Sequence, residues 1–245
     1  MPLYMDLDGL RCFQADEAAI WRDTVPDAAD EVARWQSAFL TANGRPPAVA
    51  LDQVTHWLQA AERISFQQIA AHLLDALTPQ RDLSALDLVV VAHWTPDCVM
   101  GFSVTNFILH RLQAEQAYAF AVSDCGRAAP FQAIALIDNY LPAAQGTALL
   151  VMVDQPLLLE SGHHLEARPS GAALLLDRRV GRFALRPYSS DESRRDALLK
   201  GDPDRLSVAP FYALQQHLAA GAAQPVRLSS ADDSSGLLVT PREAA

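Results

Sequence analysis

Three short apolar runs that alternate with two longer helical patterns constrain the fold of this chain more than any other feature. The runs are Leu88–Ala92, Ala117–Val122 and Ala148–Val153, and each is short and rich in Val or small residues. Such runs are typical of strands that are buried on both faces. The stretches between them, Phe102–Leu112 and Ala128–Leu141, have the apolar spacing of helices. This order predicts an α/β fold in which crossover helices connect the strands of a parallel sheet.

A cysteine lies where the second of these strands passes into its helix, in the segment Ser123-Asp124-Cys125-Gly126. Open α/β sheets bind their ligands outside the carboxyl ends of the strands. A helix N-terminus also favours the thiolate over the thiol. Cys125 is therefore a candidate nucleophile, and the alternative interpretation is a small buried hydrophobic residue. A carboxylate at Asp124 would oppose thiolate formation unless it points away from the sulfur.

The charge and the cysteine content exclude several classes of function. With 19 Lys and Arg against 29 Asp and Glu, the formal net charge is −10. An acidic protein does not attract nucleic acid or an anionic membrane, so we expect neither as a partner. The cysteines Cys12, Cys98 and Cys125 have no CxxC spacing, and no Asp, Glu or His accompanies His163-His164 at metal spacing. We therefore expect no disulfide framework and no metal site, and we interpret Cys12 and Cys98 as structural.

The N-terminal sequence MPLYMDLDGL has neither the basic region nor the apolar region of a signal peptide. No apolar run approaches the roughly 20 residues that span a bilayer. Together with the sparse cysteines, these features predict a soluble protein of the reducing cytoplasm.

The segments on either side of the central stretch are also predicted to fold. Before it, we expect a strand over Leu3–Phe13, helices over Ala28–Leu40 and Asp52–Arg63, and a further helix with Ser65 as its N-cap. After it, Gly171–Leu176 is predicted to be a strand, and no internal repeat is evident. The remaining expectations are a hairpin partner for that strand over Arg182–Arg186, a helical turn at Arg194–Leu199, a helix over Pro210–Leu218 capped by Ser207, and strands over Pro225–Ser230 and Leu237–Thr240.

Four segments resemble, in order and spacing, the ketoacyl-ACP synthase III-type condensing enzymes of the thiolase superfamily. The segments are LDLVVVAHWTPD, AYAFAVSDCGRAAPFQAIALIDNYL, GTALLVMVD and GAALLLDR, and they cover about residues 80–180. The resemblance implies a thiolase-like fold and places the family's nucleophilic cysteine, which takes the acyl group as a thioester, on Cys125. It implies an acyl-CoA or acyl-carrier-protein thioester as substrate and no bound cofactor.

The sequence departs from this family in its C-terminal half, which supplies the family's catalytic histidine and asparagine. After Leu176 only about 70 residues remain, the only later histidine is His217, and the last asparagine is Asn139. His93, directly after a predicted strand, is a candidate substitute base if it reaches Cys125 across neighbouring strand ends. The alternative interpretation of His93 is a hydrogen-bonded histidine at a strand end.

The end of the chain resembles abbreviated thiolase-fold proteins, including the small subunit of heterodimeric alkylquinolone synthases. The residues that carry this resemblance are LSVAPFYALQQHL followed by PVRLSSADDSSGLLVTP. It implies that the N-terminal βαβαβ half is retained and the C-terminal half is shortened. The chain is then one truncated domain over residues 1–245, with an N-terminal strand and helical insertion (1–79), a nucleophile-bearing core (80–180) and an abbreviated C-terminal part (181–245).

Three functions remain open at this point. The first is an accessory subunit that pairs with a full-length condensing enzyme, as a heterodimer or heterotetramer, and completes its substrate tunnel in fatty-acyl or polyketide-type secondary-metabolite biosynthesis. The second is a stand-alone acyltransferase that forms an acyl-thioester on Cys125 from acyl-CoA or an acyl carrier protein. The third is a non-catalytic homodimeric binding protein.

Overall fold

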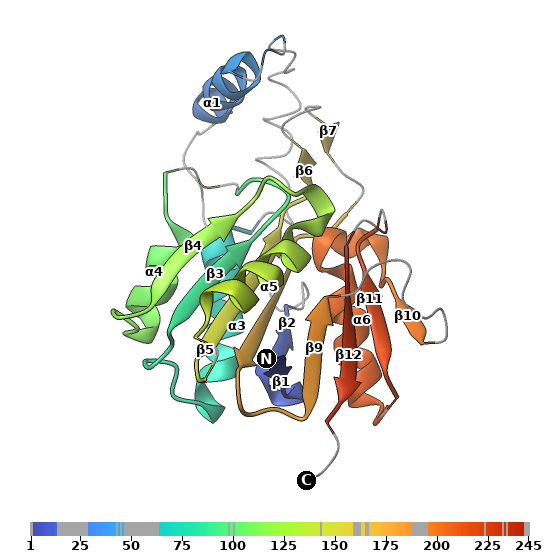
Figure 1. Cartoon of the computed structure of the whole chain (residues 1–245). Coiled ribbons are helices and arrows are strands. Elements are labelled where there is room, and N and C mark those ends of the chain that lie inside the picture. Colours follow the sequence, from blue (N-terminus) through green and yellow to red (C-terminus); the bar gives the residue numbers. More distant parts are fainter. Residues whose placement is uncertain are drawn as a thin grey trace.

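The computed structural model describes residues 2–13, 29–42, 44, 46, 64–97, 99, 101–142, 144–158, 163–164, 167–187, 196–222, 224–231, 233 and 235–242. Within these residues a large mixed sheet forms the centre of the molecule, with helices against it (Figure 1). The strands of this sheet are β1 (Leu3–Met5), β2 (Leu10–Cys12), β3 (Leu88–Ala92), β4 (Tyr118–Val122), β5 (Thr147–Asp154), β8 (Ser170–Asp177), β9 (Phe183–Pro187), β10 (Ala197–Leu199), β11 (Val226–Ser229) and β12 (Gly236–Pro241). Their order is β10-β11-β12-β9-β1-β8-β5-β3-β4, and β2 also pairs with β8. Two short strands, β6 (Leu157–Leu158) and β7 (His163–His164), pair only with each other.

The helices confirm most of the sequence-based boundaries to within two residues. They are α1 (Ala29–Ala42), α3 (Phe66–Leu77), α4 (Val104–Leu112), α5 (Ala129–Tyr140) and α6 (Ala209–Ala219), with the 3-10 turns η1 (Leu7–Gly9), η3 (Thr78–Gln80), η4 (Gly126–Ala128) and η5 (Pro203–Val208). Ser65 is the N-cap of α3, because its side chain accepts from the Gln68 N–H in a capping box. The helix predicted over 52–63 lies outside the described residues. None of the described helices has both the length and the apolar character needed to cross a membrane.

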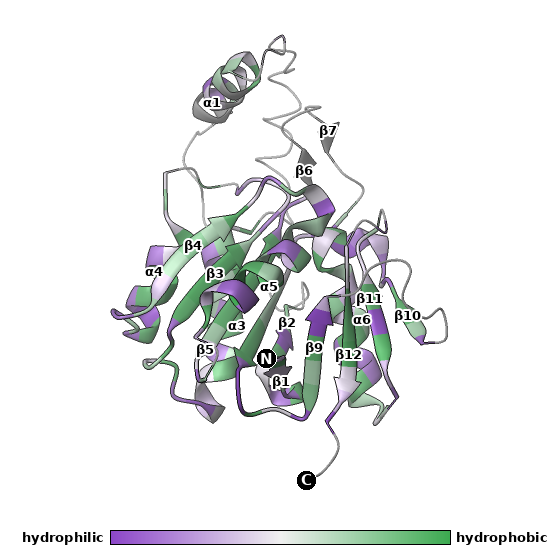
Figure 2. Cartoon of the chain, in the orientation of Figure 1, coloured by the Kyte–Doolittle hydropathy of each residue, from purple (hydrophilic) through white to green (hydrophobic). Residues whose placement is uncertain are grey.

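The three central strands form as predicted and divide the core into two clusters. Alternate residues of β3 and β5 pack toward α5 and α6 on one face and toward α3 and α4 on the other. β3 pairs in parallel with both β4 and β5, so the carboxyl ends of these strands meet at one edge of the sheet. Figure 2 shows the hydrophobic colouring concentrated on β3, β4 and β5. The fold class predicted from the sequence, an α/β fold with a retained N-terminal βαβαβ half, is confirmed.

The topology contains an internal duplication that the sequence analysis did not find. Outward from the antiparallel β1–β9 pair, each direction gives two antiparallel pairings and then a parallel one: β1-β8-β5-β3 and β9-β12-β11-β10. The helices that precede β5 and β11 both begin with Ala-Pro-Phe, at Ala129 and Ala209. Their Phe131 and Phe211 rings meet with centroids 5.8 Å apart. The second half of the described chain has no counterpart of α4 and β4, so the C-terminal half is the shortened one.

Two predictions for the strands around β1 and β9 are wrong. The strand expected over 3–13 is interrupted by η1, and its two pieces pair with different neighbours. The expected hairpin between 171–176 and 182–186 does not form, because β1 lies between β8 and β9 and pairs with both. β1, which is distant in the sequence, thus takes the place beside β8 that was expected for residues 182–186.

Two predictions in the C-terminal part are also wrong. Residues 197–199, expected in a helical turn, form strand β10 against β11. Ser207 does not cap α6, whose N-cap is Val208 without a side-chain hydrogen bond. Both the N–H and the hydroxyl of Ser207 instead donate to the buried carboxylate of Asp154, which holds Ser207 away from the first turn of α6.

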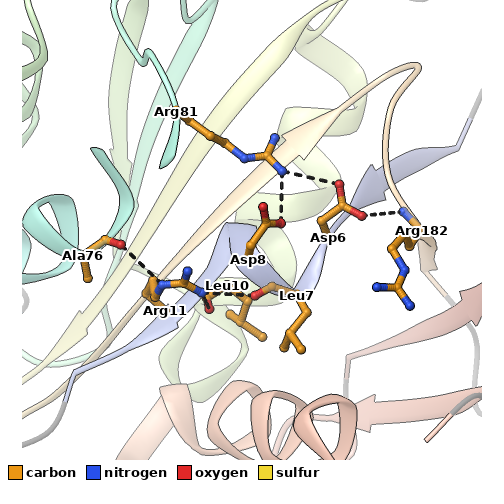
Figure 3. Close-up of polar contacts among 8 residues, drawn as sticks. All are labelled: Asp6, Leu7, Asp8, Leu10, Arg11, Ala76, Arg81 and Arg182. Atoms are coloured by element: carbon orange, nitrogen blue, oxygen red, sulfur yellow. Dashed lines mark hydrogen bonds and ion pairs between the residues drawn. The ribbon is translucent and has the colours of Figure 1, made fainter. Parts of the chain in front are cut away.

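Ion pairs fasten the N-terminal segment at the amino end of the parallel strands (Figure 3). Nη2 of Arg81 lies 3.4 Å from Asp6 Oδ2 and 3.1 Å from Asp8 Oδ1, and the Arg182 N–H donates to Asp6 Oδ1 at 2.8 Å. Arg11 donates to the carbonyls of Leu7, Leu10 and Ala76. Exposed pairs of this kind contribute about 1 kcal/mol or less each. They hold β1 and β2 in register far from the edge where Cys125 lies.

Candidate active site

Cys125 lies at the edge of the sheet where the carboxyl ends of β3, β4 and β5 meet. Val122, the last residue of β4, is in register with Ala92 of β3, and Cys125 begins the turn η4 that leads into α5. The cysteine is exposed, and the N–H of Ala128 donates to its carbonyl at 3.1 Å. Gly126 has a φ of +55°, a conformation that favours glycine directly after the cysteine. The strand-to-helix placement predicted for Cys125 is therefore the one that the structure has.

Trp94 and Arg127 flank the cysteine turn. The Arg127 guanidinium lies 4.6 Å above the Trp94 ring, and the ring's Cδ1 and Nε1 lie 3.9 Å from the point where a Cβ on Gly126 would be. This cation–π contact fixes the turn against the loop that follows β3. Asp124 accepts from Ser123 Oγ at 3.2 Å. The Asp124 carboxylate is therefore hydrogen-bonded to the residue that precedes it, on the side of the turn that faces β4.

A cavity of about 250 Å³ opens beside this turn, between η4 and the C-terminal part of the chain. Among the described residues that line it, Arg127 is the only one from the N-terminal half of the fold. Leu206 in its wall has φ +54° and ψ −131°, a conformation that non-glycine residues rarely adopt and that concentrates at functional sites. The other lining residues are Lys200, Gly201, Pro203, Ser207, Ala209, Pro210, Ser230 and Ala231.

The Asp154 carboxylate, at the end of β5, is fully buried and accepts five hydrogen bonds. Oδ1 accepts from the N–H groups of Trp94 and Thr95 at 2.7 and 3.0 Å and from Thr95 Oγ1 at 3.3 Å. Oδ2 accepts from the N–H of Ser207 at 3.0 Å and from its hydroxyl. Burial raises the pKa of Asp154, while the hydrogen bonds from Ser207, Thr95 and Trp94 act in the opposite direction.

His93 lies on the other face of the sheet from α5. Its ring packs against Phe66 of α3 with centroids 5.3 Å apart, and Nδ1 lies 2.8 Å from the Thr95 carbonyl. Val91 and Val89, two and four residues earlier, face the same α3 side. No contact joins the His93 ring to Cys125 among the described residues. The proposed role of His93 as a base stays a prediction, and its surroundings are those of a hydrogen-bonded histidine at a strand end.

A second cysteine, Cys12, lies in a half-buried cluster at the end of β2. Burial raises the pKa of its thiol to about 12, against the opposing charge of Arg205. The Arg205 guanidinium lies 4.7 Å from the Tyr212 ring. The Tyr212 hydroxyl donates to the Phe13 carbonyl, and burial raises the Tyr212 pKa as well. Cys12 is therefore a neutral thiol at physiological pH, not a nucleophile.

We expect the contribution of Cys12 to stability to disappear in alkaline solution. The folded chain keeps the thiol proton up to about pH 12, whereas the unfolded chain loses it near the ordinary value of 9.0, so the unfolded state is favoured between these values. The free-energy difference between wild type and Cys12→Ala should fall by about 1.2 kcal/mol from about pH 9.5 to about pH 10.5. Urea denaturation at the two pH values measures it, and an unchanged difference would contradict the raised pKa of the Cys12 thiol.

The side chains of the remaining residues considered in the sequence lie outside the described part of the structure. Cys98 lies outside the described residues, and His163 and His164 are placed only as backbone of β7. In the described part of the chain, no cluster of three or more His, Cys, Asp or Glu side chains is arranged to hold a metal. Sequence reasoning missed Trp94, Arg127 and Asp154 as neighbours of the cysteine turn. The one signal that pointed to Asp154 was a lone carboxylate at the end of an apolar strand.

Comparison with known proteins rests on structure alone, since no family model and no curated protein matches the sequence. ChlB3, described as an acyltransferase, shares 11% identity with a TM-score of 0.60, covering 98% of each chain. The 3-oxoacyl-(acyl carrier protein) synthase III FabH of Pseudomonas aeruginosa shares 15% identity with a TM-score of 0.53 over 100% of each chain. The fold is thiolase-like. OleA of Xanthomonas campestris has the same fold, at 10% identity and a TM-score of 0.56, covering 98% of this chain and 97% of OleA.

In this thiolase-like fold, Cys125 lies between β4 and α5. The structural neighbours are condensing enzymes and acyltransferases, and in this chain the cysteine turn lies at the strand-to-helix junction that the sequence resemblance indicated. At these identities the comparison establishes the shared fold. The chemistry of this chain has to be argued from its own residues.

Proposed function

We propose that this chain is an accessory subunit that pairs with a full-length condensing enzyme of the synthase III type and helps to enclose its acyl tunnel. The observation that carries the proposal is the free edge of β4. The strand order ends at β4, so one side of this strand has no partner among the described residues. An unpaired edge next to the candidate nucleophile is suited to pairing with a strand of another subunit.

The backbone of β4 presents hydrogen-bonding groups along that edge. The N–H of Tyr118 donates to Asp87 and the carbonyl of Val122 accepts from His93, both toward β3. Because the direction alternates along a strand in a parallel pair, the N–H and C=O groups of Ala119 and Ala121 point to the open side. Ala119 and Ala121 can therefore form backbone hydrogen bonds with a strand of a partner subunit, which would extend the sheet.

An aromatic patch lies beside the same edge. Tyr118 and Tyr140 are 60% and 59% exposed, and their ring centroids lie 6.1 Å apart. Phe120 contacts both rings, at 5.8 and 5.6 Å. Clustered exposed aromatic rings are typical of a protein–protein interface. The partner's strand would be aligned by the hydrogen bonds of β4, and the aromatic patch would add apolar contact area to the same interface.

The surroundings of Cys125 also favour an accessory role over a complete condensing enzyme. Neither a histidine nor an asparagine contacts its thiol in the described part of the chain, and the last asparagine, Asn139, lies on α5. His217 lies on α6 with its Nε2 buried. The proposed pathway class is fatty-acyl or polyketide-type secondary-metabolite biosynthesis, with an acyl carrier protein as a further partner.

Co-expression tests the proposal. The full chain is produced with each full-length synthase III-like enzyme from the same genome, and complexes are analysed by size-exclusion chromatography with light scattering. We expect one stable complex with an equal number of both chains. A chain that elutes as a monomer or as its own dimer beside every such enzyme would contradict the proposal.

A second candidate function is acyl transfer on Cys125, which the exposure of this thiol favours. ChlB3, similar in fold, is described as an acyltransferase. The Cys125 thiolate would attack the thioester carbonyl of an acyl-CoA or acyl carrier protein, forming a new C–S bond while the donor thiol leaves and takes up a proton. Intact-protein mass spectrometry with acyl-CoA donors tests it: the adduct should be lost in Cys125→Ala and retained in Cys12→Ala. No adduct from acyl-CoA or acyl carrier protein would exclude this function.

A further inference from the structure

We infer that Asp154 is a positioning residue for the turn that carries Cys125 and that it acts through Trp94. It also joins that turn to the wall of the cavity beside Arg127. The inference concerns how the thiol is held and applies whether Cys125 takes an acyl group or only lies at an interface. It can therefore fail while the proposed function holds, and the reverse is also true.

The first step is the connection between the carboxylate and Trp94. The Trp94 N–H donates to Asp154 Oδ1 at 2.7 Å, the shorter of the two backbone hydrogen bonds to that oxygen. Thr95 adds its own N–H and hydroxyl to the same atom, and its Oγ1 accepts from the N–H of Gln155 at 2.5 Å. The loop after β3 is thus held at successive residues by the end of β5.

The second step leads from Trp94 to the cysteine. Its ring lies under the Arg127 guanidinium and against Gly126, the residue that follows Cys125. Gly126 has a positive φ and no side chain, so the ring can lie close to the backbone of the turn. A shift of the loop after β3 would therefore move the Trp94 ring, against which the first residues of η4 pack.

The third step leads from the other carboxylate oxygen to the cavity. Oδ2 receives both the N–H and the hydroxyl of Ser207, and Ser207 lines the cavity together with Arg127. The two oxygens of one buried side chain thus hold opposite sides of the site. One side belongs to the N-terminal half of the duplicated fold and the other to the C-terminal half.

The test measures the alkylation rate of Cys125 by iodoacetamide, resolved by peptide mass spectrometry, with the half-buried Cys12 as an internal reference. We expect Asp154→Asn to change the Cys125 rate at least about threefold, because a loosened turn no longer holds the exposed thiol in one position. Cys12 should stay protected, which shows that the core is intact.

A double-mutant cycle separates positioning from a general loss of stability. In a Trp94→Ala background, Asp154→Asn should change the Cys125 rate by less than about 1.5-fold, since the link is already broken. Independent, multiplying effects of the two substitutions would overturn the inference. So would an unchanged Cys125 rate in Asp154→Asn. If Asp154→Asn exposes Cys12, the same cycle is repeated with Thr95→Val, which removes the hydroxyl that donates to Asp154 Oδ1. Multiplying effects or an unchanged Cys125 rate in that cycle would again overturn the inference.

Discussion

Replacing Gly171 by alanine is expected to lower the free energy of unfolding by about 3 kcal/mol, the upper end of what overpacking costs. A Cβ at this position of β8 would lie 2.3 Å from Ile69 Cγ2 on α3 and 3.2 Å from the Met152 carbonyl on β5. The backbone cannot move away freely, because the Gly171 carbonyl accepts from Phe13 at 2.8 Å and its N–H lies 3.4 Å from the Tyr212 hydroxyl. Urea denaturation measures the change.

The second variant of this experiment removes the atom that causes the clash. Ile69→Ala deletes Cγ2 and by itself should cost about 2 to 5 kcal/mol. Combined with Gly171→Ala, it should give a total smaller than the sum by at least about 1 kcal/mol, because the new methyl group occupies the vacated space. Additive costs would show that crowding against α3 is not the cause. Gly221→Ala is the control. Nothing lies within 4 Å of a Cβ at this position, so alanine there adds only the strain of a φ of +78° and no clash.

The sequence was sufficient wherever a structure depends on neighbours along the chain. The runs at β3 and β5 are apolar on both faces, and only a strand covered by helices on each side can bury them. Ser65 with Gln68 carries the whole capping box within four residues. The placement of Cys125 followed from the same kind of local pattern, a strand followed by a helix.

The sequence was insufficient where the deciding partner lies far along the chain. The hairpin expected for β8 and β9 fails because β1, more than 150 residues earlier, takes the place between them. Asp154 receives its hydrogen bonds from residues 60, 59 and 53 positions away, and no spacing rule connects these positions. Such contacts depend on the assembled sheet, not on local preference.

The duplication of the fold is an intermediate case. The repeated Ala-Pro-Phe at Ala129 and Ala209 was visible in the sequence, but three residues carry too little information to establish a repeat. Proline at the first helical turn is common, since its missing N–H has no partner there in any helix. The strand directions on the two sides of the β1–β9 pair show that the two Ala-Pro-Phe segments occupy equivalent positions in the two halves of the sheet.

Replacing Ala121 by proline is expected to weaken the complex with the condensing enzyme more than a hundredfold while the chain still folds. Proline removes the N–H that Ala121 presents at the open edge of β4 and adds a ring in its place, a loss of about 3 kcal/mol in pairing. The hydrogen bonds between β3 and β4 use the alternate residues, including Tyr118 and Val122, and remain intact. The free energy of unfolding should therefore change by about 1 kcal/mol or less, as edge strands tolerate proline. Ala121→Val keeps the N–H and is the matched control, and light scattering of the co-expressed chains measures both variants. If Ala121→Pro pairs as tightly as Ala121→Val, the complex does not form through the edge of β4, and the observation that carries the proposed function fails.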